Sequence, residues 1–336
     1  MVEAGDEKIY QTRQSLLKWY REHRRPLPWR AHSDPYLIWI SEVMLQQTTV
    51  QAVIPFYERF IERFPTVHSL AESTIEDVYE YWAGLGYYSR ARNLHKAAGE
   101  LSASGFPKSY EQLLKMPGFG PYTSRAVSSL AFGEKVGVVD GNVIRVLSRL
   151  FDKPFEWWKT KDKNELQLIS DSLAKTKHVK DLNQAIMELG ATVCTPKSPA
   201  CLLCPVSQLC KGFELNNHFD LPIKKPKKQK EIWHWDIQVA NDKGKIAFAK
   251  ESYTPFLKNY SLFPGSVKKL KSPPKTFDYK HMVTHYEIYV SVNSVSKAKL
   301  KKSAGPFNWI SKKQIQRNIP LSIVNKALEI SDKQTT

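Results

Sequence analysis

The only four cysteines of this 336-residue chain fall within 17 residues, spaced Cys194-x6-Cys201-x2-Cys204-x5-Cys210. A disulfide framework distributes its cysteines along the chain, so this cluster favours a local metal site. Thiolates suit both zinc and iron–sulfur clusters. Zinc ribbons usually carry two Cys-x2-Cys pairs, and only one is present here, which favours a four-iron cluster over the zinc alternative. Lys197, inside the same loop, is a candidate phosphate contact.

Two carboxylates occupy unusual positions. Glu42 lies in the largely apolar helical stretch 39–45, where a charge is costly unless it is exposed or functional. If the side chain faces a cleft, burial should raise its pKa, which suits a general acid. Asp140 stands in the apolar and glycine-containing run 138–143. Helix capping is the simpler explanation for this second carboxylate.

A Gly-x-Gly turn, with Gly118 and Gly120, separates two helical patterns within residues 113–130. Such a turn exposes consecutive backbone N–H groups at the start of a helix, and these groups together with the helix dipole favour a phosphate. The pattern is typical of a helix–hairpin–helix, which clamps a nucleic-acid backbone without reading its sequence. A plain turn is the alternative.

The elements that must position these residues are helices. Apolar residues recur at three- and four-residue intervals from residue 8 to about 218, which predicts an all-α domain over residues 1–218. Asp34-Pro35 predicts a helix start with an N-cap and a proline at the first position. Ser73-x-x-Glu76 fits a capping box.

The pattern changes after a lysine- and proline-rich stretch at 219–230, which we interpret as an extended linker. Residues 231–336 are expected to form an α+β domain. Three segments have strand-like patterns and one segment is an amphipathic helix. The expected strands are 232–240, 245–249 and 285–292, and the expected helix is 321–330.

The chain carries a formal net charge of +17, and the charge is unevenly distributed. Residues 221–336 hold 23 basic and 8 acidic side chains. Such an excess favours a polyanionic partner, although solubility alone is an alternative explanation.

No apolar run approaches the length of a membrane span, and the first ten residues lack a signal-peptide core. We therefore expect a cytoplasmic protein without a membrane partner, associated with the nucleoid if the source is bacterial.

Long strings at several separate places resemble the helix–hairpin–helix DNA glycosylases, and within them the adenine-specific mismatch (MutY) family. The resemblance rests on Ser-Glu-Val-Met-Leu-Gln-Gln-Thr at 41–48, Gly-Leu-Gly-Tyr-Tyr-Ser-Arg-Ala-Arg-Asn-Leu at 84–94 and Pro-Gly-x-Gly-Pro-Tyr-Thr at 117–123, together with the cysteine spacing. It covers residues 8–216 closely and the remainder more loosely. It implies base excision repair of adenine paired with 8-oxoguanine or guanine in double-stranded DNA, and a [4Fe–4S] cluster on the four cysteines.

The resemblance also assigns catalytic roles. Glu42 corresponds to the acid that protonates the extruded adenine, and Asp140 to the carboxylate that stabilises the sugar cation. Tyr122 and Asn142 correspond to residues that orient these carboxylates. Related bifunctional enzymes place a Schiff-base lysine where this chain has Tyr122, so we expect base excision without efficient strand cleavage.

Further positions carry over from the family to substrate and DNA contacts. Trp29 and Arg30 correspond to residues near the flipped adenine, and Gln184 to an adenine-contacting position. Gln47 and Tyr87 correspond to residues that fill or probe the duplex beside the lesion, Tyr87 as an aromatic wedge. Ordinary core packing is the alternative for Trp29 and Tyr87.

Residues 260–265 resemble the strand and turn at the start of a Nudix-type fold. The glutamate-rich helix that would hold Mg²⁺ is missing after it, so we expect a recognition module rather than a hydrolase. The family detects 8-oxoguanine with a Phe-Ser-His loop, where this chain has Val283-Thr284-His285. Thr284 and His285 keep the polar groups, whereas Val283 lacks the aromatic ring.

Two other functions remain open from the residues. One is a pyrimidine-lesion glycosylase with lyase activity on the same fold, which Tyr122 disfavours. The other is a non-catalytic iron–sulfur protein that binds DNA. Because duplex binding needs only one copy, we expect a monomer.

Overall fold

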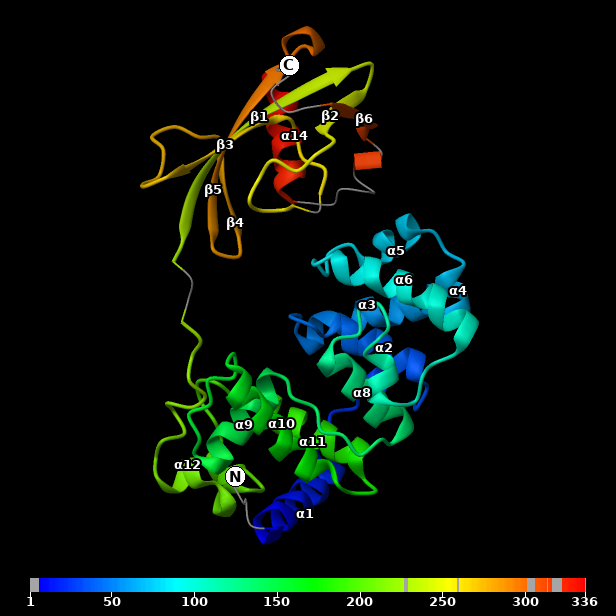
Figure 1. Ribbon diagram of the computed structural model, residues 1–336, viewed down its shortest axis with the longest axis vertical. Helices are drawn as coiled ribbons and strands as arrows, with labels where there is room; N and C mark the ends of the chain where they lie inside the picture. The colour runs from blue at the N-terminus through cyan, green and yellow to red at the C-terminus, as the bar shows by residue number, and fades with distance from the viewer. Residues whose placement is uncertain are drawn as a thin grey trace. The chain divides into compact units, whose positions relative to one another are not determined.

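The computed structural model describes residues 6–226, 229–258, 260–300, 306–312, 314–315 and 322–335. The chain divides into two compact units, with the boundary between Lys225 and Pro226. This boundary lies inside the lysine-rich stretch 219–230. In the described residues before it, the regular structure consists of helices, as expected, whereas the second unit contains a sheet (Figure 1).

The first unit places its helices in two groups. Figure 1 shows α2 to α6 and α8 on one side, and α1 with α9 to α12 on the other. The α-helices are α1 (Asp6–His23), α2 (Pro35–Met44), α3 (Val50–Arg63), α4 (Val67–Ala71), α5 (Ile75–Trp82), α6 (Ser89–Ser104), α7 (Tyr110–Leu113), α8 (Pro121–Phe132), α9 (Gly141–Phe151), α10 (Thr160–Ala174), α11 (Val179–Thr192) and α12 (Lys211–Glu214). Short 3₁₀ helices are η1 (Pro28–Arg30), η2 (Cys201–Leu203) and η3 (Ser207–Leu209).

Helix α2 begins as its sequence predicts. The Asp34 carboxylate accepts a hydrogen bond from the Tyr36 backbone N–H at 2.8 Å, and Pro35 occupies the first turn. Almost every side chain of α2 is buried, as expected for a helix that is apolar on all sides. Trp39 stacks on Phe119 with ring centroids 5.3 Å apart, which fixes α2 against the turn before α8.

The Gly-x-Gly turn connects α7 to α8. Gly118 has a φ of +75°, and a Cβ there would lie 2.8 Å from the Cβ of Asn93. Only glycine meets both demands. Gly120 is the N-cap of α8, and Pro121 is in its first turn. Gly118 is exposed at this turn, and the first N–H groups of a helix have no partner within the helix, which is what the helix–hairpin–helix pattern uses.

Helices α9 and α11 approach each other closely at Gly190 and Asn142. Asp140 caps α9, since its Oδ1 accepts from the Val143 N–H at 2.7 Å. On the facing helix, a Cβ at Gly190 would lie 2.6 Å from the Cβ of Asn142. The absence of a side chain at 190 thus lets α11 approach the start of α9.

The cap of α5 lies one residue later than the sequence suggested. The Ser73 hydroxyl donates to the Leu70 carbonyl at 2.7 Å and so completes α4. Thr74 takes the extended N-cap conformation, and its hydroxyl accepts from the Asp77 N–H at 3.2 Å. The expected capping box between Ser73 and Glu76 was therefore wrong, because the first of two adjacent hydroxyls is used by the preceding helix.

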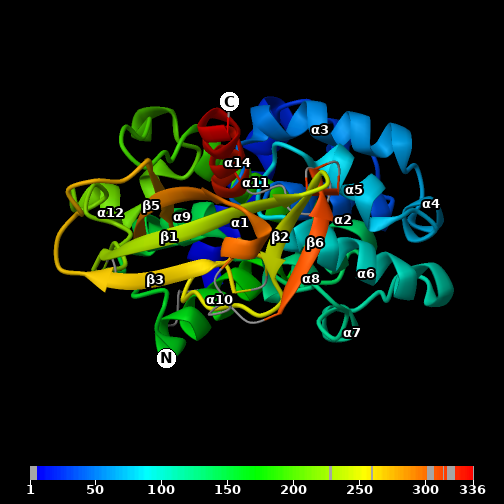
Figure 2. The ribbon, with the colours of Figure 1, turned by 90° about the horizontal axis from the view of Figure 1, so that it is seen from above.

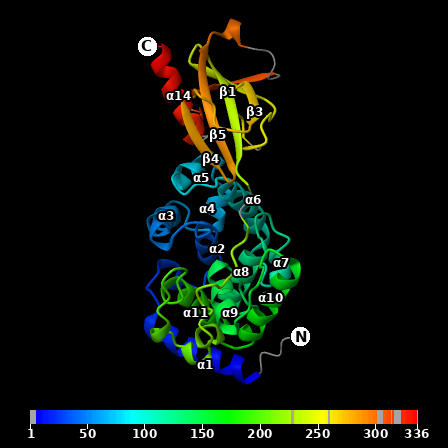
Figure 3. The same cartoon turned by 90° about the vertical axis from the view of Figure 1, so that its left-hand side faces the viewer.

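The second unit is a mixed sheet with the order β4-β5-β1-β2-β6, in which β3 also pairs with β1. The pair β1–β5 is parallel, and the other pairs are antiparallel. Figure 2 shows β5, β1 and β3 side by side, and Figure 3 shows α14 along the sheet, where it contacts β5 and β1. The elements are β1 (Glu231–Asp242), β2 (Lys245–Ala249), β3 (Gly265–Leu270), β4 (Tyr279–Val283), β5 (Tyr286–Val295), η4 (Lys297–Lys299), β6 (Phe307–Ser311) and α14 (Ser322–Thr335).

The expected strands at 232–240, 245–249 and 285–292 are found as β1, β2 and β5, and the expected final helix is α14. Residues 260–264 form no strand, and β3 begins only at Gly265. A Cβ at Gly265 would lie 2.1 Å from the Asp236 carbonyl oxygen, so glycine permits the tight pairing of β3 with β1. The likeness of this unit to a Nudix fold stays a prediction.

The described helices include none that is both long enough and apolar enough to cross a lipid bilayer.

Candidate active site

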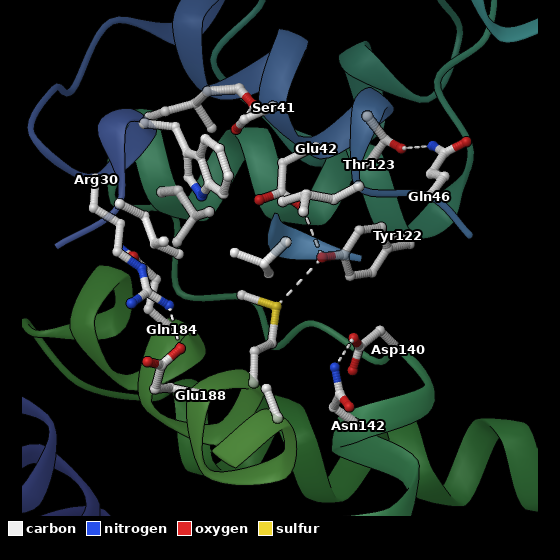
Figure 4. Close-up of a pocket in the computed structure, with 18 of the residues that line it drawn as sticks. Arg30, Ser41, Glu42, Gln46, Tyr122, Thr123, Asp140, Asn142, Gln184 and Glu188 are labelled. Atoms are coloured by element: carbon white, nitrogen blue, oxygen red, sulfur yellow. Dashed lines mark hydrogen bonds and ion pairs between the residues drawn. The ribbon is translucent and has the colours of Figure 1, made fainter. Parts of the chain in front are cut away.

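A cavity of about 670 Å³ lies between the two helix groups of the first unit. Figure 4 shows side chains from α2, α8, α9 and α11 converging on it. The sequence-predicted residues that line it are Trp29, Arg30, Glu42, Gln47, Gly118, Gly120, Tyr122, Asp140, Asn142 and Gln184. The structure therefore brings together segments as distant in sequence as η1 and α11.

Glu42 lies buried on α2 and faces this cavity. Burial raises the pKa of Glu42 from its ordinary 4.5 to about 7, and the negative charge of Asp140 adds to the effect. The Tyr122 hydroxyl opposes the rise by donating to Glu42 Oε2 at 2.7 Å. The pKa of Tyr122 is itself raised well above 10 by burial, so Tyr122 keeps its proton and remains a donor. The carboxyl of Glu42 can therefore hold a proton near neutral pH and give it up.

Asp140 presents its second carboxylate oxygen to the same cavity. While Oδ1 caps α9, Oδ2 accepts from the Asn142 side-chain amide at 3.0 Å. Burial raises the pKa of Asp140, and the hydrogen bonds from the Val143 N–H and from Asn142 oppose that rise. The capping explanation does not exclude a functional one, because the cap uses only one of the two carboxylate oxygens.

The sequence reading missed an ion triad on the cavity wall. Glu188 is buried on α11 and accepts from Arg25 Nε at 2.7 Å and from Arg30 Nη2 at 2.7 Å. Burial alone would raise the pKa of Glu188, but hydrogen bonds from the two arginines outweigh it and lower the pKa to about 2. The criterion that selected Glu42, a charge inside an apolar helical run, would also have selected Glu188.

Other predicted residues sit at the rim of the cavity or inside its wall. Gln184 is buried, and its side-chain oxygen accepts from the Tyr20 hydroxyl at 2.9 Å. Trp29 is buried too and lines the cavity, so its core position does not separate it from the site. Gln47 is exposed and has a φ of +59°.

Four predicted contact residues lie outside this cavity. Tyr87 is 57% exposed on the loop before α6, with a φ of +50°. Lys197 is exposed in the cysteine loop. Thr284 and His285 form the turn between β4 and β5, where the Thr284 hydroxyl and His285 Nδ1 are 3.2 Å apart.

The four cysteines line one small cavity, together with Arg149, Phe213 and His218 among others. In the part of the chain that the structure describes, no group of three or more His, Cys, Asp or Glu side chains is arranged to hold a single metal ion. A zinc ion needs thiolates about 2.3 Å from one centre. A multi-iron cluster offers a separate iron to each thiolate, which suits four cysteines that line one cavity.

Two side chains beside the cysteines support a cluster at this place. Arg149 is buried and donates to Cys194 Sγ at 3.4 Å and to the Thr195 carbonyl at 2.8 Å. His218 is buried as well, and its Nδ1 has no hydrogen-bond partner. A cluster brings sulfur acceptors into the cavity that such polar groups line.

Comparison with known proteins agrees with this geometry. A family model described as "HhH-GPD superfamily base excision DNA repair protein" matches residues 40–190, and one described as "Iron-sulfur binding domain of endonuclease III" matches residues 194–210. An adenine DNA glycosylase of Buchnera aphidicola subsp. Baizongia pistaciae is 33% identical over 306 residues, which cover 83% of this chain and 84% of the relative. This chain belongs to the adenine DNA glycosylase family.

Other relatives and solved structures match about three fifths of this chain. The adenine DNA glycosylase of Mus musculus is 42% identical over 214 residues, covering 60% of this chain and 42% of the mouse protein. A solved thermostable thymine-DNA glycosylase superposes with a TM-score of 0.58 at 29% identity, covering 63% of this chain and 99% of that structure. A non-covalent endonuclease III–DNA complex has a TM-score of 0.53 at 24% identity, covering 64% and 99%, and shares the fold.

As a member of the adenine DNA glycosylase family, the chain is an enzyme, a DNA glycosylase of base excision repair. Its cofactor is a [4Fe–4S] cluster. Cys194, Cys201, Cys204 and Cys210 are the residues that would hold it, since the matched segment begins and ends on the first and last of them.

Proposed function

We propose that this enzyme removes adenine mispaired with 8-oxoguanine or guanine from double-stranded DNA, by hydrolysis of the N-glycosidic bond and without cutting the strand. One observation carries the proposal: a carboxyl with a pKa of about 7 shares a pocket with a second carboxylate that is already hydrogen-bonded. Two carboxyl groups in such unequal environments suit an acid and a cation stabiliser.

The first step needs an acid because adenine is a poor leaving group. Glu42 donates its proton to a ring nitrogen of the extruded adenine. The C1′–N9 bond then breaks, and its electron pair leaves with the base. Tyr122 holds the Glu42 carboxyl in place and stabilises the carboxylate that remains, through the 2.7 Å hydrogen bond.

The sugar is left as an oxocarbenium-like cation. Asp140 stabilises this cation electrostatically from a position that α9 fixes. A water then attacks C1′, and Glu42 takes up the proton that the water loses. The products are free adenine and an abasic site, and Glu42 ends protonated as it began.

Tyr122 also argues against strand cleavage. A lyase needs an amine that forms a Schiff base with the opened sugar. Tyr122 offers a phenol with a pKa well above 10 at the start of α8, and it is bound to Glu42 and to Met187 Sδ at 3.3 Å. We therefore propose hydrolysis alone.

DNA contacts follow from exposed groups. The backbone N–H groups at the start of α8 and Lys197 contact phosphates, while Gln47 and Tyr87 enter the duplex beside the target base.

In the second unit, the turn with Thr284 and His285 contacts 8-oxoguanine. The His285 ring lies against the Tyr286 ring, with centroids 4.1 Å apart and a tilt of 35° between the planes, which supports an aromatic face at this turn although Val283 lacks a ring. The cluster, when bound, fixes the segment 194–210, and no catalytic step passes through it.

The test is a single-turnover excision assay with Glu42→Gln and, as a matched control, Glu22→Gln on the exposed surface of α1. Duplexes carry adenine opposite 8-oxoguanine, guanine or thymine. We expect E42Q to bind the mispairs but to excise nothing, E22Q to resemble wild type, and adenine opposite thymine to persist. Excision by E42Q at the wild-type rate would overturn the proposal.

The two other functions predict different results. A pyrimidine-lesion glycosylase would release thymine opposite guanine or an oxidised pyrimidine, and borohydride would trap it on the DNA. A non-catalytic binding protein would bind every duplex and release no base. Since Glu42 and Tyr122 are arranged as an acid and its orienting donor, we expect neither outcome.

A further inference from the structure

Arg90, on the first turn of α6, connects two loops that lie far apart in sequence. One loop, residues 45–49, follows α2, and the other, residues 83–88, precedes α6. The guanidinium atoms Nη1 and Nη2 donate to five backbone carbonyl oxygens, those of Val43 (2.8 Å), Met44 (3.0 Å), Gln46 (2.6 Å), Leu85 (3.2 Å) and Gly86 (3.3 Å).

Each loop carries one exposed side chain on an unusual backbone. Gln47 has a φ of +59° and Tyr87 a φ of +50°, in the left-handed region that non-glycine residues rarely adopt. Such conformations persist where the surrounding structure fixes them, and they cluster at functional sites. Gln47 lines the cavity and is exposed, and Tyr87 is more than half exposed, so both side chains are accessible to a bound duplex.

The contacts of Arg90 require an arginine. A planar guanidinium offers five donors in a fixed fork, whereas a lysine offers one ammonium that cannot reach acceptors on both loops. A cation is also favourable at the C-terminal end of α2, where the last carbonyls lack helical partners. The guanidinium further lies 5.4 Å from the ring centroid of Trp82 and 5.5 Å from that of Tyr87.

We propose that Arg90 is a positioning residue that locks these two loops into one rigid unit, so that Gln47 and Tyr87 enter the duplex together and the target base leaves the stack beside the pocket. This inference rests on the proposed function and adds a step to it. Arg90 touches no reacting atom, so it acts on base extrusion and leaves the acid chemistry of Glu42 unchanged.

The test compares Arg90→Lys with Arg92→Lys, the same substitution at an exposed position two residues further along α6. A duplex with 2-aminopurine in place of the target adenine reports unstacking by fluorescence. We expect R90K to lose the fluorescence rise and to excise adenine about tenfold more slowly, while the midpoint of its pH–rate profile stays at the wild-type value. R92K should resemble wild type in all three readouts.

An R90K protein with normal fluorescence, or one whose pH midpoint moves with the rate, would overturn the inference.

If R90K does not fold, a double-mutant cycle on the otherwise intact enzyme decides whether the two loops are coupled. Gln47→Ala and Tyr87→Ala should together reduce the fluorescence rise by a factor different from the product of the single effects, because rigidly joined loops act as a unit. Independent effects would refute the coupling. A wild-type enzyme that unstacks 2-aminopurine but excises no adenine would refute the proposed function instead.

Discussion

The hydroxyl of Tyr122 donates to Glu42 Oε2 across 2.7 Å, from the first turn of α8 to the buried face of α2. A donor at this place favours the ionised carboxylate and so lowers its pKa, whereas burial raises it. The balance leaves the pKa of Glu42 at about 7, near the pH at which a general acid works best. Tyr122 therefore lowers the pKa of Glu42 as well as holding its carboxyl in place.

Removal of this donor by Tyr122→Phe should move the pKa of Glu42 further up. Because excision needs the protonated acid, the rate should fall through a midpoint near pH 7 in wild type and at a higher pH in Y122F. We also expect the maximal rate to fall about tenfold, since the carboxyl is no longer held. Single-turnover rates from pH 5 to 9 measure both. Tyr57→Phe, which deletes a buried hydroxyl without a partner, is the control, and identical midpoints for all three proteins would contradict the prediction.

Glu42→Gln should make the folded protein more stable at high pH. The folded-state pKa of about 7 exceeds the ordinary 4.5, so protonation of Glu42 favours folding below pH 4.5, and this contribution is lost as the pH rises to 7. Glutamine carries no charge to bury. We expect E42Q to gain up to about 3 kcal/mol over wild type at pH 8 and little at pH 4.5, measured by urea unfolding. An equal gain at both pH values would point to packing rather than charge.

Asp140 allows capping and chemistry to be separated. Asn caps a helix as well as Asp, so Asp140→Asn should unfold at nearly the wild-type urea concentration, yet excise at least about 100-fold more slowly for want of a negative charge. Asp140→Ala should lose the same activity and about 1 kcal/mol of stability as well. If D140N keeps its activity, the carboxylate has no electrostatic role.

Glu188→Gln tests the ion triad. Leaving Arg25 and Arg30 without a buried carboxylate should destabilise the protein by about 3 kcal/mol at pH 7. The lowered pKa of about 2 implies that wild type loses this advantage as the pH falls from 4.5 toward 2. Asp77→Asn breaks the exposed pair with Arg63 and should cost less than about 1 kcal/mol. Comparable losses for the two variants in urea unfolding would refute the assignment.

Arg149→Lys tests the support of the cluster loop. Arg149 Nε and its Nη atoms reach the carbonyls of Leu221 and Thr195 as well as Cys194 Sγ, and one ammonium cannot replace all of these donors. We expect the visible absorbance of the cluster to bleach several-fold faster in a chelator. Arg125→Lys, which alters an ion pair on α8 with Asp171, is the matched control and should bleach like wild type.

The main features of the site could be predicted from the sequence wherever the type of a residue and its immediate neighbours are enough to indicate its role. Asp34-Pro35 marks a helix start by local chemistry alone, and the structure has it there. Glu42 is conspicuous because burying a charged side chain in an apolar helix is energetically costly unless the charge is functional. The four cysteines are recognisable because their spacing is local.

Features that depend on contacts between distant segments were not predictable in the same way. The triad of Glu188 joins α11 to Arg25 and Arg30, which lie 163 and 158 positions earlier, and no local pattern indicates these partners. Ser73 and Thr74 are equivalent as local capping residues, and only the end of α4 decides between them. Strand β3 carries two adjacent exposed lysines, Lys268 and Lys269, and is defined by its pairing with β1 rather than by an alternating pattern of its own.

Asp140 both caps α9 and lines the cavity, and this combination restricts how the position can evolve. One oxygen secures the first turn of α9, and the other accepts from Asn142 at the cavity, where the proposed reaction places the ribose. Most replacements at 140 would therefore disturb the scaffold and the proposed reaction together. A charge anchored in this way is already oriented before any nucleoside arrives, and little reorganisation remains to be done during bond cleavage. The same anchoring leaves this position little freedom to drift.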